Sequence, residues 1–122
     1  MAFQNDLAKA KHSVVIAVPK VKFKYKPAII STLTKLLHEG VAMVVHIKEE
    51  GADEMELANA GMDVICSKEQ TLQCAIIDKS IVWYGSINFF GYNSETNNVM
   101  RIADHRIANE MIEILYSDPR KA

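Results

Sequence analysis

The stretch Thr71–Asn88, TLQCAIIDKSIVWYGSIN, decides the fold of this 122-residue chain. It contains two short apolar runs, 72–77 and 81–84, on either side of a polar Asp-Lys-Ser segment. Runs of this length that are rich in β-branched and aromatic residues and separated by turn formers predict a hairpin of antiparallel strands. The second strand leads into the tetrapeptide Gly85–Asn88, where a glycine lets the backbone and small polar side chains approach a ligand. The sequence therefore predicts a scaffold for an anion at this corner.

The spacing of polar residues around this corner resembles that of a known family. Asp78, six residues, Gly85-Ser86, one residue and Asn88 resemble the second half of the signature His-x-Lys-x4-Asp-x6-Gly-Ser/Gly-x-Asn of the phospholipase D-like superfamily. Asn97 falls where that family often has a further asparagine. The resemblance implies a site that holds phosphate.

The positions of the family's nucleophilic histidine and its lysine are occupied here by Thr71 and Gln73. The resemblance implies chemistry in which a histidine attacks phosphorus to form a phosphohistidine while lysines neutralise the phosphoryl oxygens. A threonine hydroxyl needs an adjacent base, which the nearby sequence does not supply, and a glutamine brings no charge. Val99 stands where the family commonly has a glutamate that orients the histidine. We therefore expect no catalytic residue, only vestigial positions at Thr71, Gln73 and Asp78. The residues expected to bind phosphate are Gln73, Ser86, Asn88 and Asn97.

A second stretch, residues 46–53 with the sequence HIKEEGAD, matches His-x-Lys-x4-Asp literally. No Gly-Ser-x-Asn follows Asp53 at the required distance, and the neighbouring carboxylates would repel a phosphodiester. We interpret this match as a coincidence, because its sequence context does not support the motif.

Length and composition predict one soluble domain. A chain with 49% hydrophobic and 24% charged residues is long enough to bury a single core. No apolar run reaches the roughly 20 residues of a membrane span, and the N-terminus lacks the apolar core of a signal peptide, so we expect a cytoplasmic protein. We expect a single domain, cut from a larger protein, with an N-terminal arm over 1–11, a core over 12–116 and a tail over 117–122.

The two cysteines, Cys66 and Cys74, are eight residues apart, with no CxxC and no histidine at metal spacing. We expect both to be reduced and buried. The sequence predicts no metal site and no cofactor.

Charge is distributed unevenly along the chain, although the net charge is −1. Residues 1–48 hold eight lysines and two acidic residues, whereas residues 49–122 hold six basic and thirteen acidic residues. Within segment 19–27, PKVKFKYKP, every second residue is a lysine, namely Lys20, Lys22, Lys24 and Lys26. An extended segment would present all four ammonium groups on one side, as a ribbon that contacts nucleic-acid phosphates. The alternative is a solvated strand edge, where lysines prevent pairing with another strand.

Apolar periodicity predicts the remaining elements. Further strands are expected over 12–18, 41–47, 62–66 and 99–103, and helices over 27–40, 49–60 and from 105, with Asp104 as N-cap. In the acidic helix 49–60, Met55 and Ala58 are expected to face the core and the carboxylates to face solvent. The alternation of strands and helices predicts right-handed crossovers between parallel strands. Together with the resemblance, which extends over 12–116, this predicts an α/β fold with a mixed sheet of six or seven strands flanked by helices, equivalent to one phospholipase D-like half.

The resemblance also implies a partner. In that family two such halves assemble one catalytic site, so we expect a homodimer or pairing with a second half. The motif region is similar to modules at the ends of bacterial DNA helicases and restriction-type ATPases, although the sequence has no GxxxxGK[ST] phosphate loop. Our leading hypothesis is a catalytically degenerate module for nucleic-acid backbone binding and dimerisation, accessory to a DNA helicase. The alternatives are an active phosphodiesterase or nuclease half-site completed by a partner chain, and a purely structural protein-interaction domain.

Overall fold

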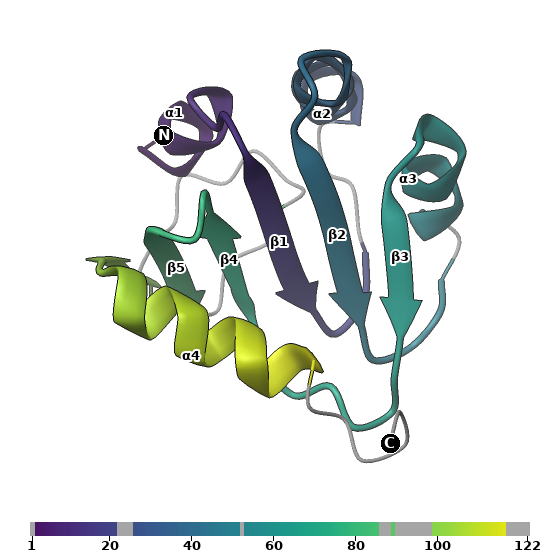
Figure 1. Ribbon diagram of the computed structural model, residues 1–122. Coiled ribbons are helices and arrows are strands. Elements are labelled where there is room, and N and C mark those ends of the chain that lie inside the picture. Colours follow the sequence, from purple (N-terminus) through teal and green to yellow (C-terminus); the bar gives the residue numbers. More distant parts are fainter. Residues whose placement is uncertain (1, 22–25, 52, 86–88, 90–98, 117–122) are drawn as a thin grey trace.

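The computed structural model describes residues 2–21, 26–51, 53–85, 89 and 99–116. They form a mixed six-stranded sheet with helices on both faces, which confirms the predicted fold class (Figure 1). The strands are β1 (Ser13–Val18), β2 (Ala42–Ile47), β3 (Asp63–Cys66), β4 (Cys74–Ile77), β5 (Ile81–Gly85) and β6 (Val99–Ala103). The helices are α1 (Ala2–Ala8), α2 (Lys26–His38), α3 (Glu54–Ala60) and α4 (His105–Tyr116).

The strand order is β3-β2-β1-β4-β5-β6. The strands β1, β2 and β3 are parallel, while β4, β5 and β6 are each antiparallel to the preceding neighbour in this order. Strands β1, β2, β3 and β5 therefore all end at one edge of the sheet, where β4 and β6 begin. We call this the carboxyl edge, and the opposite one the amino edge.

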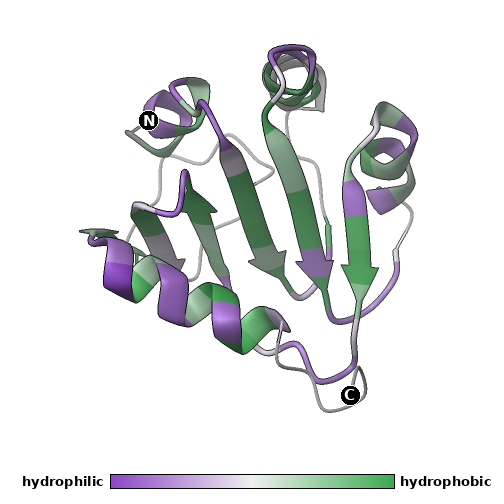
Figure 2. Cartoon of the chain, viewed as in Figure 1, coloured by the Kyte–Doolittle hydropathy of each residue, from purple (hydrophilic) through white to green (hydrophobic). Residues whose placement is uncertain are grey.

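Alternation along the central strand β1 divides the core into two layers. Val14, Ile16 and Val18 pack with α1, α2 and α3 on one face, whereas Val15 and Ala17 pack with α4 on the other. Because β1 is covered on both faces, it is apolar throughout, as is typical of a central strand. Figure 2 shows this arrangement as hydrophobic central strands behind an α4 helix whose outer surface is hydrophilic.

The segment predicted as an N-terminal arm forms helix α1 and belongs to the core. Phe3 and Leu7, four residues apart on one face of α1, are both fully buried. The Phe3 ring packs edge-on against Trp83 and Phe89, with centroids 5.9 and 5.0 Å apart. Asp6 accepts hydrogen bonds from Trp83 Nε1 (2.8 Å) and Arg101 Nε (2.7 Å), so α1 is fixed to β5 and β6.

The sequence-based prediction of which residues of α3 face the core was wrong. Leu57 is fully buried and Glu54 is 7% exposed, whereas Met55 is 59% exposed and Ala58 is also exposed. Both carboxylate oxygens of Glu54 accept the Gly51 N–H, at 2.9 and 3.0 Å. The helix begins at Glu54 and not at residue 49, because the Glu54 carboxylate binds a backbone N–H of the loop that precedes the helix.

Candidate nucleic-acid site

The hairpin of β4 and β5 brings the two halves of the predicted site together at the carboxyl edge. Cys74 pairs with Tyr84, and one residue further the Gly85 N–H donates to the Gln73 carbonyl (3.2 Å). Gly85 has φ of +144°, a conformation that favours glycine over residues with a side chain. Gln73 and Gly85 are therefore neighbours in space although twelve residues separate them in the sequence.

Thr71 and Gln73, the positions that the resemblance equates with a histidine and a lysine, differ in exposure. Thr71 is exposed and lies outside any helix or strand, and Gln73 is half-buried just before β4. Of the other residues expected to bind phosphate, Ser86, Asn88 and Asn97 lie outside the described residues. The structure thus places Gln73 beside Gly85, and phosphate binding by Gln73, Ser86, Asn88 and Asn97 stays a prediction.

All four histidines of the chain are described, and none is exposed at the carboxyl edge. His12 immediately precedes β1, His38 ends α2 and His105 begins α4, so these three lie toward the amino edge. His46 is near the end of β2 but only 2% exposed, with its ring edge-on to Tyr116 at 5.0 Å. The burial of His46 agrees with the interpretation of the match at 46–53 as a coincidence. No histidine of this chain is thus placed to attack a phosphodiester at the corner of Gln73 and Gly85.

Asp78, predicted from the sequence to belong to the same site, lies at the opposite end of the hairpin. Five residues of extended chain separate it from Gln73, roughly 16 Å. Its carboxylate accepts backbone N–H groups from Lys11 (3.1 Å), His12 (2.7 Å) and Ser13 (3.1 Å). Burial alone would raise the pKa of Asp78, but the three hydrogen bonds outweigh it and hold that pKa below its ordinary value. Asp78 therefore fastens the start of β1 to the hairpin and is too far away to contact a phosphate at the carboxyl edge.

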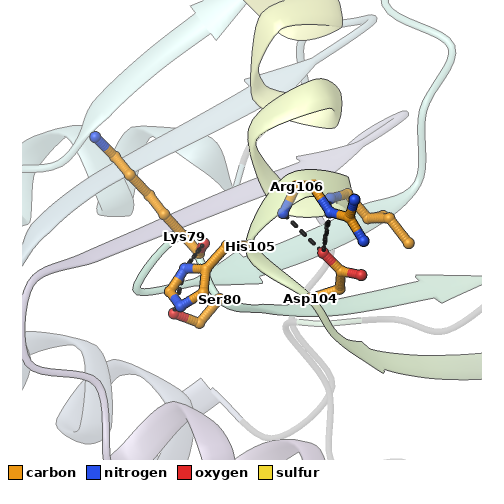
Figure 3. Close-up of polar contacts among 6 residues, drawn as sticks. Lys79, Ser80, Asp104, His105 and Arg106 are labelled. Carbon is orange, nitrogen blue, oxygen red and sulfur yellow. Dashed lines mark hydrogen bonds and ion pairs between the residues drawn. The ribbon is translucent and has the colours of Figure 1, made fainter.

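The hairpin turn and the start of α4 complete the network at the amino edge. Asp78 and Lys79 both have φ of 54°, and the Ser80 N–H donates to the Ile77 carbonyl (3.0 Å). His105 Nδ1 lies 3.2 Å from the Lys79 carbonyl, an acceptor, so this ring nitrogen is the donor (Figure 3). As predicted, Asp104 caps α4, accepting the N–H of Arg106 at 2.8 Å.

Only part of the predicted lysine ribbon lies within the described residues. Lys20 is exposed just beyond the end of β1, and its side chain extends over Gly51, where an added Cβ would lie 2.6 Å from Lys20 Cε. Lys22 and Lys24 lie outside the described residues. Lys26 is the first residue of α2, so the prediction of an extended strand through all four lysines fails there.

Sequence reasoning missed Gln70, which braces the segment that carries Thr71 and Gln73. The Gln70 side chain is 8% exposed. Its Nε2 donates to the Val18 carbonyl at 3.0 Å, and its Oε1 accepts the Leu72 N–H at 2.5 Å. This amide therefore joins the end of β1 to the chain entering β4. A single glutamine between two polar stretches carries no sequence signal for such a role.

A small cavity of about 260 Å³ opens at the other side of the carboxyl edge, between β2, α3 and β3. Its lining includes Glu50, Glu54, Met55, Val64 and Cys66. The carboxylate of Glu50 at this cavity disfavours a phosphate there.

The cysteine prediction holds for one residue only. Both thiols are free, but Cys66 is exposed, and its Sγ donates to the Lys48 carbonyl at 3.7 Å. Cys74 is fully buried, and burial raises the pKa of its thiol to about 12. Within the described part of the chain, no group of three or more histidine, cysteine or acidic side chains could hold a metal. None of the described helices is long and apolar enough to cross a membrane.

No family model and no curated protein matches the sequence. The fold is similar to that of Nuc, a phospholipase D family member from Salmonella typhimurium, with a TM-score of 0.74, 22% identity, and coverage of 95% of this chain and 83% of that chain. It is also similar to NucT from Helicobacter pylori (TM-score 0.71, 16% identity, 95% and 84% coverage). A third neighbour is TrmBL2, an archaeal chromatin protein with a novel mode of DNA binding (TM-score 0.64, 15% identity, 95% and 47% coverage). These similarities confirm the predicted phospholipase D-like fold.

Proposed function

We propose that this chain is a catalytically degenerate phospholipase D-like module that binds the phosphate backbone of nucleic acid at its carboxyl edge. It pairs with a second copy or a second half, and it serves as the accessory domain of a bacterial DNA helicase.

The observation that carries this proposal is the chemistry of the corner formed by Gln73 and Gly85. The corner holds Gln73, through its backbone carbonyl, next to a glycine that ends a strand, and the exposed Thr71 lies two residues before it. An amide donates hydrogen bonds to phosphate oxygens without supplying a nucleophile or a positive charge. Such a corner binds a phosphodiester and does not cleave it.

The neighbours in fold support nucleic acid as the ligand. TrmBL2, which shares this fold over 95% of the present chain, is described as a DNA-binding chromatin protein. The exposed Lys20 lies at the same edge as Gln73 and offers one backbone contact beyond the corner. Helicase association rests on the similarity of the motif region to helicase-terminal modules. Pairing rests on the resemblance to a family that builds one site from two halves.

Two other functions remain as alternatives. A partner chain could supply the missing histidine and complete an active phosphodiesterase half-site, which predicts turnover of a generic phosphodiester. A purely structural role would leave the corner as a turn that the hairpin needs, which predicts no nucleic-acid binding even at low salt.

The test is fluorescence-anisotropy binding of a short labelled single strand and a short duplex, at about 50 and about 200 mM salt. We expect binding that weakens as salt rises. Replacing an exposed lysine that contacts a phosphate should reduce the log–log salt slope by about 0.7–0.9. Lys20→Gln should show this reduction, while Lys79→Gln, which removes an exposed lysine from the amino edge, should not.

A double variant, Thr71→His with Gln73→Lys, tests the register of the degenerate site. We expect phosphodiesterase activity to appear in the double variant and to be absent from the wild-type chain. Turnover by the wild type would favour the enzymatic alternative. If neither protein binds nucleic acid at the lower salt concentration, the structural alternative replaces the proposal.

A further inference from the structure

Two large apolar side chains stand exposed beside the corner of Gln73 and Gly85. Tyr84 on β5 and Met100 on β6 face each other across the two strands, and they are 43% and 61% exposed. The next pair along the same face, Val82 and Ile102, packs against α4. The cover provided by α4 thus ends between these two pairs, and Tyr84 and Met100 form an uncovered apolar surface.

The position of this surface in the hairpin fixes its relation to the candidate phosphate site. Tyr84 immediately precedes Gly85, whose N–H donates to Gln73, and it pairs with the buried Cys74 of β4. One residue of strand, about 3.3 Å, therefore separates the tyrosine from the corner. Because successive residues of a strand face opposite sides, the ring lies on the face covered by α4 and Gln73 on the other face. A nucleic-acid strand that passes around this end of the sheet can therefore place a phosphate at the corner and a base on the ring.

We propose that Tyr84 and Met100 form a stacking platform for a nucleobase, so that the ligand of the carboxyl edge is single-stranded nucleic acid. This inference rests on the proposed function and specifies its ligand class. An aromatic ring stacks on any unpaired base, whereas the bases of a duplex are already stacked on one another. The polarizable thioether of Met100 adds a contact that tolerates different bases and rings.

A second copy of this chain is a weaker fit to the same surface. A stable protein interface needs about 800 Å² from each partner. Two side chains supply a small fraction of that area, whereas they match the size of one base.

The experiment compares two labelled strands of equal length, one with bases and one made of abasic sugar–phosphate units. The wild-type chain should bind the strand with bases about 5- to 150-fold more tightly, in line with the stacking energy of one base on one aromatic side chain. Tyr84→Leu should abolish this preference and leave the affinity for the abasic strand unchanged. Tyr84→Phe, which keeps the ring, should retain the preference. Tyr116→Leu is the matched control, because Tyr116 is also 43% exposed but packs against His46 on β2.

The outcomes separate this inference from the proposed function. Equal affinity of the wild type for both strands, or an undiminished preference in Tyr84→Leu, overturns the stacking platform and leaves backbone binding intact. Binding to neither strand overturns both. If Tyr84→Leu changes the mass in light scattering and not the affinity for the strand, the surface is an interface between copies and the platform is rejected. Circular dichroism of each variant checks that the fold is retained, and if the leucine variant is unfolded, Met100→Ala, a change at a 61% exposed side chain, provides the test and should weaken the preference.

Discussion

The two ends of the β4–β5 hairpin differ in their contacts and have different roles. At the amino edge, Asp78 accepts three backbone N–H groups that precede or begin β1, and the turn next to it contacts His105. At the carboxyl edge, Thr71 is exposed outside any helix or strand. Asp78 therefore maintains the fold, whereas the Thr71 side chain faces solvent.

This difference predicts that substitutions are tolerated better at the exposed Thr71 than at Asp78. An exposed side chain can be exchanged at little cost in stability. A carboxylate that satisfies three backbone donors cannot, because each donor would lose its acceptor.

The largest expected effect is that of Asp78→Ala. We expect the free energy of unfolding to fall by about 2–3 kcal/mol, because three backbone donors lose a charged acceptor at a partly exposed site. Alanine also tolerates the φ of 54° less well than aspartate does. Thr71→Ala should change stability by less than about 0.5 kcal/mol. Urea unfolding of the two variants measures the contrast.

Asp78→Asn serves as the control for geometry, since asparagine tolerates positive φ and keeps one oxygen acceptor. The free energy of unfolding of Asp78→Asn should lie between that of the wild type and that of Asp78→Ala. Equal stability of Asp78→Ala and Thr71→Ala would contradict the division of roles between the two edges.

A smaller effect is expected for Gln70→Ala, which removes the brace of the carboxyl edge. The change leaves the Val18 carbonyl and the Leu72 N–H without their side-chain partner, so we expect a loss of about 1–2 kcal/mol. Because the segment carrying Gln73 is then held less firmly, the affinity for a single strand should also fall. Gln70→Glu, which keeps an acceptor for Leu72 and loses the donor to Val18, separates the two contacts. Unchanged stability in both variants would show that other contacts hold this segment.

The fold was largely predictable from the sequence. Strands with continuous apolar runs, such as 13–18, and helices with clear caps, such as α4 after Asp104, were predicted to within a residue or two. The hairpin was also predicted, because its two runs flank a polar turn. Local patterns of this kind depend on neighbours in the sequence, and a single chain displays them fully.

The contacts between distant segments could not be predicted in this way. The burial of Phe3 depends on Trp83 and Phe89, eighty or more residues away, and the role of Gln70 depends on a carbonyl in β1. Glu54 appeared to belong to a solvated acidic face, yet it caps its own loop. In the candidate site, the hairpin pattern predicted that Gln73 and Gly85 are neighbours, but it could not show that Asp78 lies at the other end of the hairpin and binds the start of β1.

The smallest expected effect is a dependence of stability on acid. Burial alone would raise the pKa of Asp78 and that of Asp6. Hydrogen bonds from backbone N–H groups nevertheless hold the pKa of Asp78 below its ordinary value, and hydrogen bonds from Arg101 and Trp83 hold the pKa of Asp6 below its ordinary value. Because each folded-state pKa lies below the unfolded value of about 3.9, the unfolded chain binds more protons in that window. The stabilisation is therefore complete above about pH 4 to 5 and is lost as the pH falls through the folded pKa values.

The measurement is the urea midpoint of unfolding as a function of pH. As the pH is lowered, this midpoint should decline less steeply for Asp78→Asn than for the wild type, whereas Thr71→Val, altered at the other edge, should follow the wild type. The effect is smaller than that of Asp78→Ala because a protonated carboxyl keeps an acceptor oxygen. An equally steep decline in Asp78→Asn would assign the acid sensitivity to Asp6 and its contacts with β5 and β6, and no longer to the hairpin turn.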